Sequence, residues 1–467
     1  MSFSSRYCVD HDHVPMIKRQ MSAIAAVSLA LIGSACLAQV PASLIPAFPG
    51  AEGAGAMSLG GRSGRVLRVT NLDDSGPGSL RAAVEASGPR TVVFDIGGTI
   101  RLARPLVIRN GRITIAGQTA PGGGITLRDQ SLRVAADDVV IRFIRSRLGN
   151  ESGVEADSIW VSSGRRVILD HVSASWSTDE TLSVSSTYKR AQDDLRDVTV
   201  QWSIISESLC RRRGSDERHC YGSLVSASRG AEISFIHNLW AHHLGRMPRP
   251  NNYLAAADDP QGGSLEFRGN VFYNWGARQA GYNSGPASRI NYSFVDNAYQ
   301  RGPDSRGDIL FDERNPNASA AFEGNTLDGS STDNWQHVAG GDKPGYRLGQ
   351  ARLFHGTREA PAGRAYSGVL ALAGASLVRD PVDQRVVESV RARTGRLLDS
   401  QDDVGGWPVL ARGTPWIDSD RDGIPDDWER SHHLNPRDPR DGARAGQNGY
   451  TALETWLNSL AARAMER

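Results

Sequence analysis

This sequence of 467 residues has little cysteine, little net charge and few long apolar runs. None of its four cysteines forms a Cys-x-x-Cys pair or a Cys/His spacing of the kind that binds zinc. The formal net charge is +1, so no overall field attracts nucleic acid or an anionic membrane. We therefore expect no nucleic-acid partner, and an acidic ligand must be bound by local clusters of charge.

The longest apolar run lies near the N-terminus, in "MSAIAAVSLALIGSACLA". Basic residues precede it and small residues end it, which is typical of a secretory signal cleaved after Ala38; a membrane span needs a longer run. We expect residues 1–38 to be a signal peptide and the mature chain to be extracellular, without membrane association. The polar lead indicates that translation starts at Met16 or Met21, and acylation of Cys36 is the alternative to plain export.

Two cysteines, Cys210 and Cys220, lie beyond this signal. Exported proteins meet an oxidising environment, and nearby cysteines there commonly pair. A local disulfide between Cys210 and Cys220 is therefore the favoured interpretation, with two unpaired thiols as the alternative.

Glycine is abundant, with 50 residues and no Gly-x-y period, which favours a fold with many turns. Short β-branched runs alternate between these turns, as in "RTVVFDI", "RITIAG", "DVTVQWSII" and "RINYSFVDNAY". Such alternation is typical of strands with one buried face. No segment of helical period separates the runs, which argues against a β-α-β sheet and favours an all-β class.

The runs recur at nearly constant intervals. Steps of 28, 31, 35, 32, 27 and 28 residues separate Ile144, Val172, Ser203, Asn238, Asn270, Asn297 and Asn325. An Asn at one place in successive turns can hydrogen-bond the Asn of the next turn, forming an internal ladder. A right-handed parallel β-helix over residues 39–400 satisfies both patterns. A β-sandwich and a propeller are the alternatives, although propeller blades run to about 40–45 residues.

The composition changes near residue 400, where Pro, Asp and Gly become frequent. The segment "DSDRDGIPDDWE" has oxygen ligands at the spacing of a calcium loop, with Gly423 at the sharp turn. Its expected ligands are Asp418, Asp420, Asp422, Asp426 and Glu429. The end, "GYTALETWLNSLAARAMER", predicts a helix. We expect residues 401–467 to form an EF-hand-like or thrombospondin type 3-like calcium segment, with a merely solvated acidic loop as the alternative.

A second acidic group is spread over neighbouring turns. We expect Asp157, Asp170 and the pair Asp179/Glu180 on consecutive coils. Residues roughly one coil apart lie above one another in a β-helix, so Asp157 and that pair can converge on one face. A single Asp in such a turn is usually a solvated turn residue. The group precedes the basic segment "HHLGRMPRP", and together they predict a cation site that faces a basic edge.

Several segments resemble, in order, those of family 1 polysaccharide lyases, the pectate lyases. They are "DSIWVSSGRRVILDHVSAS", "STDETLSV", "CYGSLVSAS" and "FIHNLWAHHLGRMPRPNN", preceded by "AFPGAEGAGAMSLGGRSGRVLRVTNLDDSGPGSLRAAVEASGPRTVVFDIGGTI". The similarity covers residues 47–325. It implies calcium-assisted β-elimination of α-1,4-polygalacturonate, an acidic plant cell-wall polysaccharide, to unsaturated oligogalacturonates.

The resemblance assigns the catalytic base to Arg246, the first residue of "RMPR". Arginine is normally a poor base because its guanidinium stays protonated. A neighbouring calcium ion and the loss of solvent would favour the neutral form. The alternative is that Arg246 only pairs with an acid or caps the turn.

The resemblance also assigns active-site calcium ligands, Asp157 and Asp179. Members of the family commonly have another carboxylate four residues after the second ligand, where this chain has Ser183. Glu180 can substitute, although alternation would place its side chain on the opposite face of a strand.

The substrate clamp departs from the family pattern. Tyr221 stands where a lysine is usual, with His219 nearby, and Asn251 stands where a second arginine is usual. Arg249 and the loop "CRRRGSDERHC" can supply cations instead, since Arg211–Arg213 form a local basic run. We expect Arg249, Asn251, Tyr221 and His219 to bind substrate, with a solvated run of charge as the alternative for the loop.

Other side chains are weaker candidates. His242 and His243 titrate in the range of a general base, but adjacent histidines at a strand end are more often structural. Trp240, Tyr273 and Trp275 can stack on sugar rings, although most aromatics in these runs belong to the core. The competing functions are a polygalacturonase-type hydrolase and a non-catalytic, polysaccharide-binding β-helix surface protein. We expect a monomer.

Overall fold

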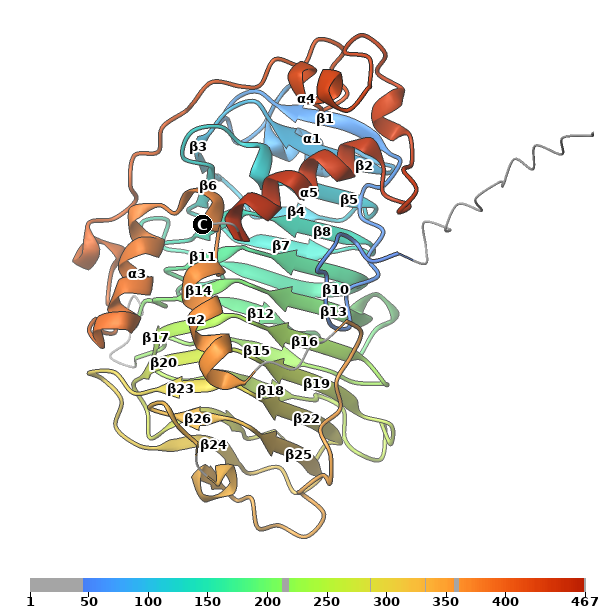
Figure 1. The fold of residues 1–467 in the computed structure, drawn as a ribbon. Helices are drawn as coiled ribbons and strands as arrows, with labels where there is room; N and C mark the ends of the chain where they lie inside the picture. The colour runs from blue at the N-terminus through green and yellow to red at the C-terminus, as the bar shows by residue number, and fades with distance from the viewer. Residues whose placement is uncertain (1–44, 212–217, 286, 332, 357–360, 466–467) are drawn as a thin grey trace, which may run out of the picture. The chain divides into compact units, whose positions relative to one another are not determined.

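The computed structural model describes residues 45–465 apart from 212–217, 286, 332 and 357–360 (Figure 1). The predicted signal peptide, residues 1–38, therefore lies outside the described residues, as do Arg212 and Arg213 of the predicted basic loop. The described residues belong to one compact unit by their contacts.

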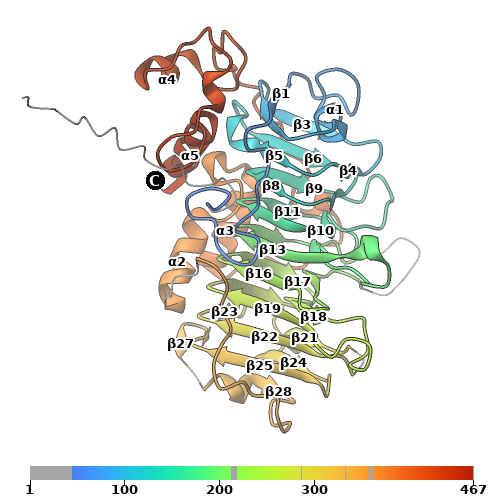
Figure 2. The ribbon, with the colours of Figure 1, turned by 90° about the vertical axis from the view of Figure 1, so that its right-hand side faces the viewer.

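The chain coils through parallel sheets, as the repeat predicted (Figures 1 and 2). The first sheet contains β1 (Arg65–Val69), β2 (Arg90–Phe94), β5 (Ile113–Ala116), β8 (Val139–Arg142), β10 (Ile159–Asp170), β13 (Leu195–Gln201), β16 (Glu232–Ile236), β19 (Gly263–Arg268), β22 (Ile290–Val295) and β25 (Ala318–Glu323). Neighbouring strands in this order pair in parallel, one coil apart. This is a parallel β-helix.

Two further sheets complete the coils. The second contains β3 (Gly98–Arg101), β6 (Ile125–Arg128), β9 (Ile144–Arg147), β11 (Ser173–Ser175), β14 (Ile204–Ser206), β17 (Leu239–His243), β20 (Val271–Trp275), β23 (Ala298–Gln300), β26 (Thr326–Leu327) and β27 (Ser330–Ser331). The third contains β4 (Leu106–Ile108), β7 (Leu132–Ala135), the first part of β10, β12 (Leu182–Val184), β15 (Leu224–Ser226) and β18 (Arg249–Asn251). A separate sheet contains β21 (Gln279–Asn283), β24 (Ile309–Glu313) and β28 (Val338–Ala339).

The chain turns a corner between the first and second sheets within a β-branched run. One such run therefore forms two short strands, as β8 and β9 do on either side of Phe143. Phe143, His171, Trp202 and His237 have φ between 49° and 56°, so the chain turns there in the left-handed region. That conformation costs roughly 1–2 kcal/mol for a residue with a Cβ. The four rings stack with centroids 4.3–6.2 Å apart, which offsets part of the cost.

The predicted asparagine ladder follows each of the later corners. Asn238 N donates to Asn270 Oδ1 at 2.8 Å, Asn270 N to Asn297 Oδ1 at 2.9 Å, and Asn297 N to Asn325 Oδ1 at 3.0 Å. Ser203 extends the ladder by donating its N–H to Asn238. These side chains are buried, so each ladder contact satisfies a backbone group that water cannot reach.

Helices cover the outside of the second sheet, where the sequence had predicted none. Alpha-helices α2 (Ala362–Leu372) and α3 (Pro381–Ala392) pack apolar residues against β14, β17 and β20. Arg147 on β9 pairs with Asp380 and Asp383 at 2.8 Å, at the start of α3, and all three side chains are fully buried. The paired charges fix α3 to the coils.

The C-terminal segment lies beside the first coils (Figures 1 and 2). It contains α4 (Asp426–Ser431) and α5 (Ala452–Met465), the second of which confirms the predicted terminal helix. At the other end of the chain, α1 (Leu80–Glu85) buries Leu80 and Val84 in the core of the β-helix. Among the described residues, every helix is too short or too polar to cross a membrane.

Candidate active site

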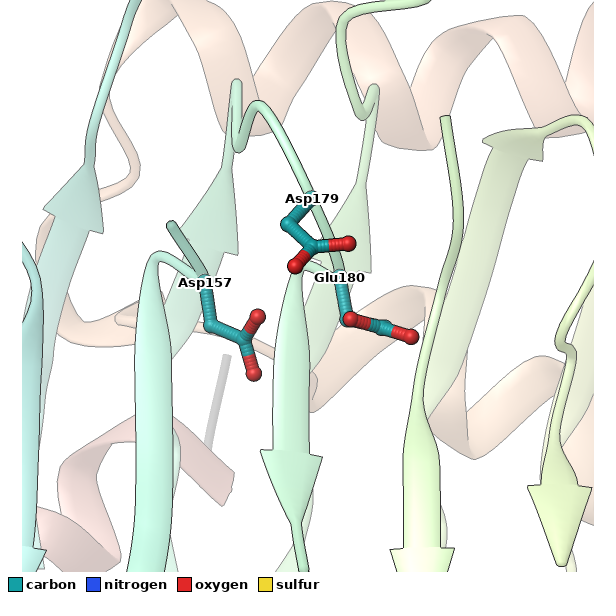
Figure 3. A group of neighbouring side chains, drawn as sticks. All are labelled: Asp157, Asp179 and Glu180. Atoms are coloured by element: carbon teal, nitrogen blue, oxygen red, sulfur yellow. The ribbon is translucent and has the colours of Figure 1, made fainter. Parts of the chain in front are cut away.

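Three carboxylates converge on one face, as the spacing of the acids predicted. Asp157 lies directly before β10, and Asp179 and Glu180 lie in the bend before β12. One oxygen of each carboxylate lies within 4.8 Å of the others (Figure 3). The bend explains why Glu180 joins the group: residues 176–181 are not a regular strand, so the alternation of faces does not apply to them.

The environment of Asp157, above all its burial, disfavours the charged form of its carboxylate. Burial and the nearby Asp179 carboxylate raise the pKa of Asp157 to about 8, although a hydrogen bond from Ser183 and the charge of Arg246 act in the opposite direction. Ser183, which stands where the family commonly has a carboxylate, is 1% exposed and also accepts from Leu224 N at 3.3 Å. A bound cation would relieve the repulsion between these acids.

Arg246 reaches Glu180 of this group from two coils further along. Its backbone has φ of +56°, in the left-handed region. The guanidinium forms an ion pair with Glu180 and lies 3.9 Å from the centre of the Tyr221 ring. Isolated parallel bridges connect Glu180 to Tyr221 and Tyr221 to Gly245, so successive coils stack the acid, the ring and the turn that carries Arg246.

The loop beside Tyr221 is closed by the predicted disulfide, which joins Cys210 and Cys220. His219 in this loop has its Nδ1 3.4 Å from Asp179 Oδ1, and its ring contacts Tyr221 edge-on at 4.5 Å. His219 and Tyr221 therefore border the acids. Of the predicted basic run, Arg211 is described and is exposed.

The two remaining clamp candidates differ in exposure. Arg249 on β18 is half-buried, with its guanidinium 5.6 Å from the Tyr282 ring, and its Nε has no hydrogen-bond partner among the described residues. Asn251 on the same strand is only 2% exposed and is paired in register with Ser226. Arg249 therefore offers more surface to a ligand than Asn251, whose buried Oδ1 has no hydrogen-bond partner among the described residues, and substrate binding by both stays a prediction.

A groove of about 790 Å³ begins at the acids and runs over the outer face of the third sheet. Its lining includes Asp157, Asp179 and Glu180 at one side. The remaining polar and aromatic lining residues are Arg104, Arg109, Ser131, Arg133, Glu155, Trp160, Ser162, Ser185, Ser186, Thr187, Arg190, Asp193 and Tyr253. Four arginines beside an acidic group suit a ligand that carries repeated negative charges.

Arg133 and Trp160 lie next to each other in the lining of this groove, and neither was predicted from the sequence. They are register partners on β7 and β10, and the Arg133 guanidinium lies 4.2 Å from the centre of the Trp160 ring. Burial and the nearby charge of Arg109 lower the pKa of Arg133, as expected for cations crowded together. A signal was present: each residue stands between two apolar residues that face inward, in "LRV" and "IWV".

The weaker candidates are structural. His242 and His243 are 1% and 0% exposed, and burial lowers the pKa of His242 to about 4 and of His243 to about 3. Trp240, Tyr273 and Trp275 are fully buried, so they pack in the interior rather than on a sugar. Asp170, also buried, pairs with Arg142 at 2.7 Å and is not part of the acid group.

Comparison with known proteins identifies the family. A protein named probable pectate lyase C from Aspergillus fumigatus strain Af293 is 35% identical over 448 residues, which span 92% of this chain and 97% of the relative. The chain belongs to the pectate lyase family. Another probable pectate lyase C, from Emericella nidulans, is 37% identical to this family member over 423 residues, with 89% and 92% of the two chains covered. No family model matches the chain.

Solved structures agree with the fold of this pectate lyase family member. A structure reported with the substrate specificity and anti-β-elimination mechanism of pectate lyase has a TM-score of 0.51 and 14% identity, covering 72% of this chain and 99% of the other. A pectate lyase bound to hexasaccharide has a TM-score of 0.50 and 14% identity, covering 70% and 96%. At such low identity these similarities support the β-helix alone.

The second predicted metal site of this family member lies in the C-terminal loop. Asp418, Asp420 and Asp422 converge, each with an oxygen within 4.8 Å of the others. Asp422 also lies in a group with Glu429 and Asp441, and Asp441 had not been predicted. Asp426 is engaged elsewhere: it accepts from Ser419 N and Oγ at 2.8 Å and pairs with Arg430.

Proposed function

We propose that this chain is a secreted pectate lyase that cleaves α-1,4-polygalacturonate by calcium-assisted β-elimination and releases unsaturated oligogalacturonates. The observation that carries the proposal is the placement of Arg246 against Asp157, Asp179 and Glu180, beside a groove lined by arginines. Membership of the pectate lyase family supports the same reaction class.

The groove suits the substrate because polygalacturonate carries one carboxylate per sugar. Arg133 and Arg109 would pair with these carboxylates, and the half-exposed Trp160 ring would contact a sugar face. Ser162 is uncharged, but it holds the Arg133 side chain in position, because its Oγ accepts a hydrogen bond from Arg133 Nε at 2.8 Å. The chain thereby orients a polyanion along the third sheet and toward the acids.

The acid group has the composition of a calcium site. Carboxylate oxygens are hard ligands, and three of them within 4.8 Å repel one another unless a cation lies between them. Asp157, Asp179 and Glu180 would bind the ion, with the Ser183 hydroxyl supporting Asp157. When bound, calcium would neutralise the substrate carboxylate and stabilise the negative charge that develops beside C5.

Arg246 is the proposed base. It would take the proton from C5; the electrons of that bond form the C4–C5 double bond, the bond from C4 to the glycosidic oxygen breaks, and that oxygen takes up a proton. A guanidine accepts a proton only in its neutral form, so the Arg246 guanidinium must first leave the ion pair with Glu180 and release a proton to solvent. Tyr221, under the guanidinium, and Tyr282, whose hydroxyl accepts from Arg246 Nε at 3.3 Å, keep the side chain in place.

The test is a comparison of two products. Purified protein is mixed with polygalacturonate, with calcium or with a chelator, and both the ultraviolet absorbance of unsaturated ends and the number of reducing ends are followed. We expect the two signals to rise together, and only with calcium. Reducing ends without the absorbance would indicate hydrolysis and overturn the proposal. Expression of the whole chain, followed by assay of the medium, tests secretion.

A further inference from the structure

The C-terminal loop contains a buried carboxylate with no partner. Glu429 on α4 is 0% exposed, and neither of its carboxylate oxygens has a hydrogen-bond partner among the described residues. Burial and four surrounding acids, with Asp422 the strongest, raise the pKa of Glu429 to about 8. A carboxylate in this position requires a positive partner.

Other oxygens around Glu429 are also without partners. Asp422 is 6% exposed with Oδ2 free, and Asp420 Oδ2 and Asp441 Oδ1 are likewise buried and free among the described residues. The second oxygens of these residues bind backbone N–H groups: Ile424 N donates to Asp422 at 2.9 Å, and Asn435 N donates to Asp441 at 2.8 Å. Asp420, Asp422 and Asp441 thus each accept a backbone hydrogen bond with one oxygen and leave the other for the acid groups around Glu429.

We propose that Asp418, Asp420, Asp422, Glu429 and Asp441 form a structural calcium site outside the groove. The two overlapping acid groups share Asp422, which joins them into one site. Asp441 takes the place that the loop spacing had assigned to Asp426, because Asp426 falls in neither acid group among the described residues and its oxygens serve Ser419 and Arg430. Calcium fits better than magnesium, because it accepts more oxygen ligands and a bidentate glutamate in flexible geometry.

The site would fasten the C-terminal segment to the first coils. Asp418 pairs with Arg68 on β1, and Ile424, within the loop, is fully buried in a cluster with Ala116 of β5 and Trp456 of α5. Gly423 has φ of +94° and lies so close to Val66 that an added Cβ would be 3.2 Å from its side chain. An ion that fixes the loop therefore also fixes the surface on which α5 packs.

The test is thermal unfolding of the full chain in calcium, in magnesium and in chelator. We expect millimolar calcium to raise the Tm by roughly 3–5 °C and magnesium to raise it less. Glu429→Gln and Asp441→Asn should lose the calcium shift. Asp427→Asn is the matched control, because Asp427 lies on the same helix with a side chain 98% exposed, and it should keep the shift.

A groove variant separates this site from the proposed active site. Asp157→Asn should lose polygalacturonate cleavage and keep the calcium shift in Tm, whereas Asp441→Asn should keep cleavage at temperatures well below its Tm. Three results would overturn the proposal. The first is a wild-type Tm that calcium does not change, the second is loss of the shift in Asp157→Asn, and the third is a full shift in Asp441→Asn. The wild-type and Asp157→Asn results decide the matter even if the tail variants do not fold. This inference does not depend on the proposed lyase reaction.

Discussion

At the scale of single residues, Glu180 connects the two parts of the candidate site. It belongs to the acid group with Asp157 and Asp179, and it forms the ion pair with Arg246. Glu180 is thus both a proposed calcium ligand and the ion-pair partner of the proposed base. Ser183, in the position where the family commonly has an acid, supports Asp157 through a hydrogen bond instead.

Arg133→Ala tests the substrate groove. The change removes a charged donor from the lining of the groove, so we expect KM for polygalacturonate to rise roughly tenfold or more with kcat nearly unchanged, as for a lost charge-assisted hydrogen bond. Arg347→Ala is the matched control, because Arg347 lies over Trp335 at 4.5 Å in the same way but is not among the groove residues. Equal KM values for the two variants would contradict the role of Arg133.

The sequence predicted those residues of the candidate site that stand in short motifs. It did not predict the groove residues that several coils bring to one face. Asp157, Asp179, Glu180 and Arg246 stand in short motifs, and the structure brings these four together. The groove arginines are spread from β4 to β12, and the face they share depends on the register of strands about one coil apart. A single motif contains no information on that register.

At the scale of elements, the coil corners determine the fold. Each of the later corners combines a residue of positive φ with a ladder position just after it, so strand direction and backbone hydrogen bonding are fixed together. The repeated Asn made the coils predictable from sequence. The helix α3 was not predicted, although the sequence contains the signals of a capped amphipathic helix. Asp380 stands at the N-cap, and Pro381 follows it. The buried valines then recur at helical spacing, at Val382, Val386, Val387 and Val390.

Asn270→Ala tests the ladder. Asn270 Oδ1 accepts from Asn238 N at 2.8 Å, and its Nδ2 donates to Phe235 O at 2.9 Å, all in the interior. Removing the amide leaves buried groups unsatisfied, so we expect the free energy of unfolding to fall by about 3 kcal/mol. Denaturant unfolding measures it. Asn317→Ala, at an exposed asparagine, is the control, and an equal loss there would contradict the ladder account.

At the scale of the whole molecule, the fold buries three neutral histidines in one coil, His237 at the corner after β16 and His242 and His243 on β17. Burial lowers the pKa of His237 and of His242 to about 4, and that of His243 to about 3. In the unfolded chain, histidine titrates near 6.5. Between these values the unfolded chain binds more protons than the folded chain, so the stability contribution is complete above about pH 6.5 and is lost as pH falls toward 4.

Acid titration of stability tests this account. Each such histidine contributes a slope of about 1.4 kcal/mol per pH unit between about pH 6 and pH 5. We expect His237→Gln to reduce the slope of unfolding free energy by about that amount, as measured by denaturant unfolding at several pH values. His433→Gln changes an exposed histidine and should leave the slope unchanged. A slope that is the same in all three proteins would be inconsistent with a neutral, buried His237.

The most direct test of the whole account is the rate of β-elimination by Arg246→Ala. Arg246 meets the acids through Glu180 and is the proposed acceptor of the C5 proton. Loss of a positioned base typically lowers kcat by about 10²–10⁴-fold, and we expect this loss while the Tm and the binding of polygalacturonate in calcium stay close to wild type. An Arg246→Ala protein that forms unsaturated product at the wild-type rate would contradict the central claim.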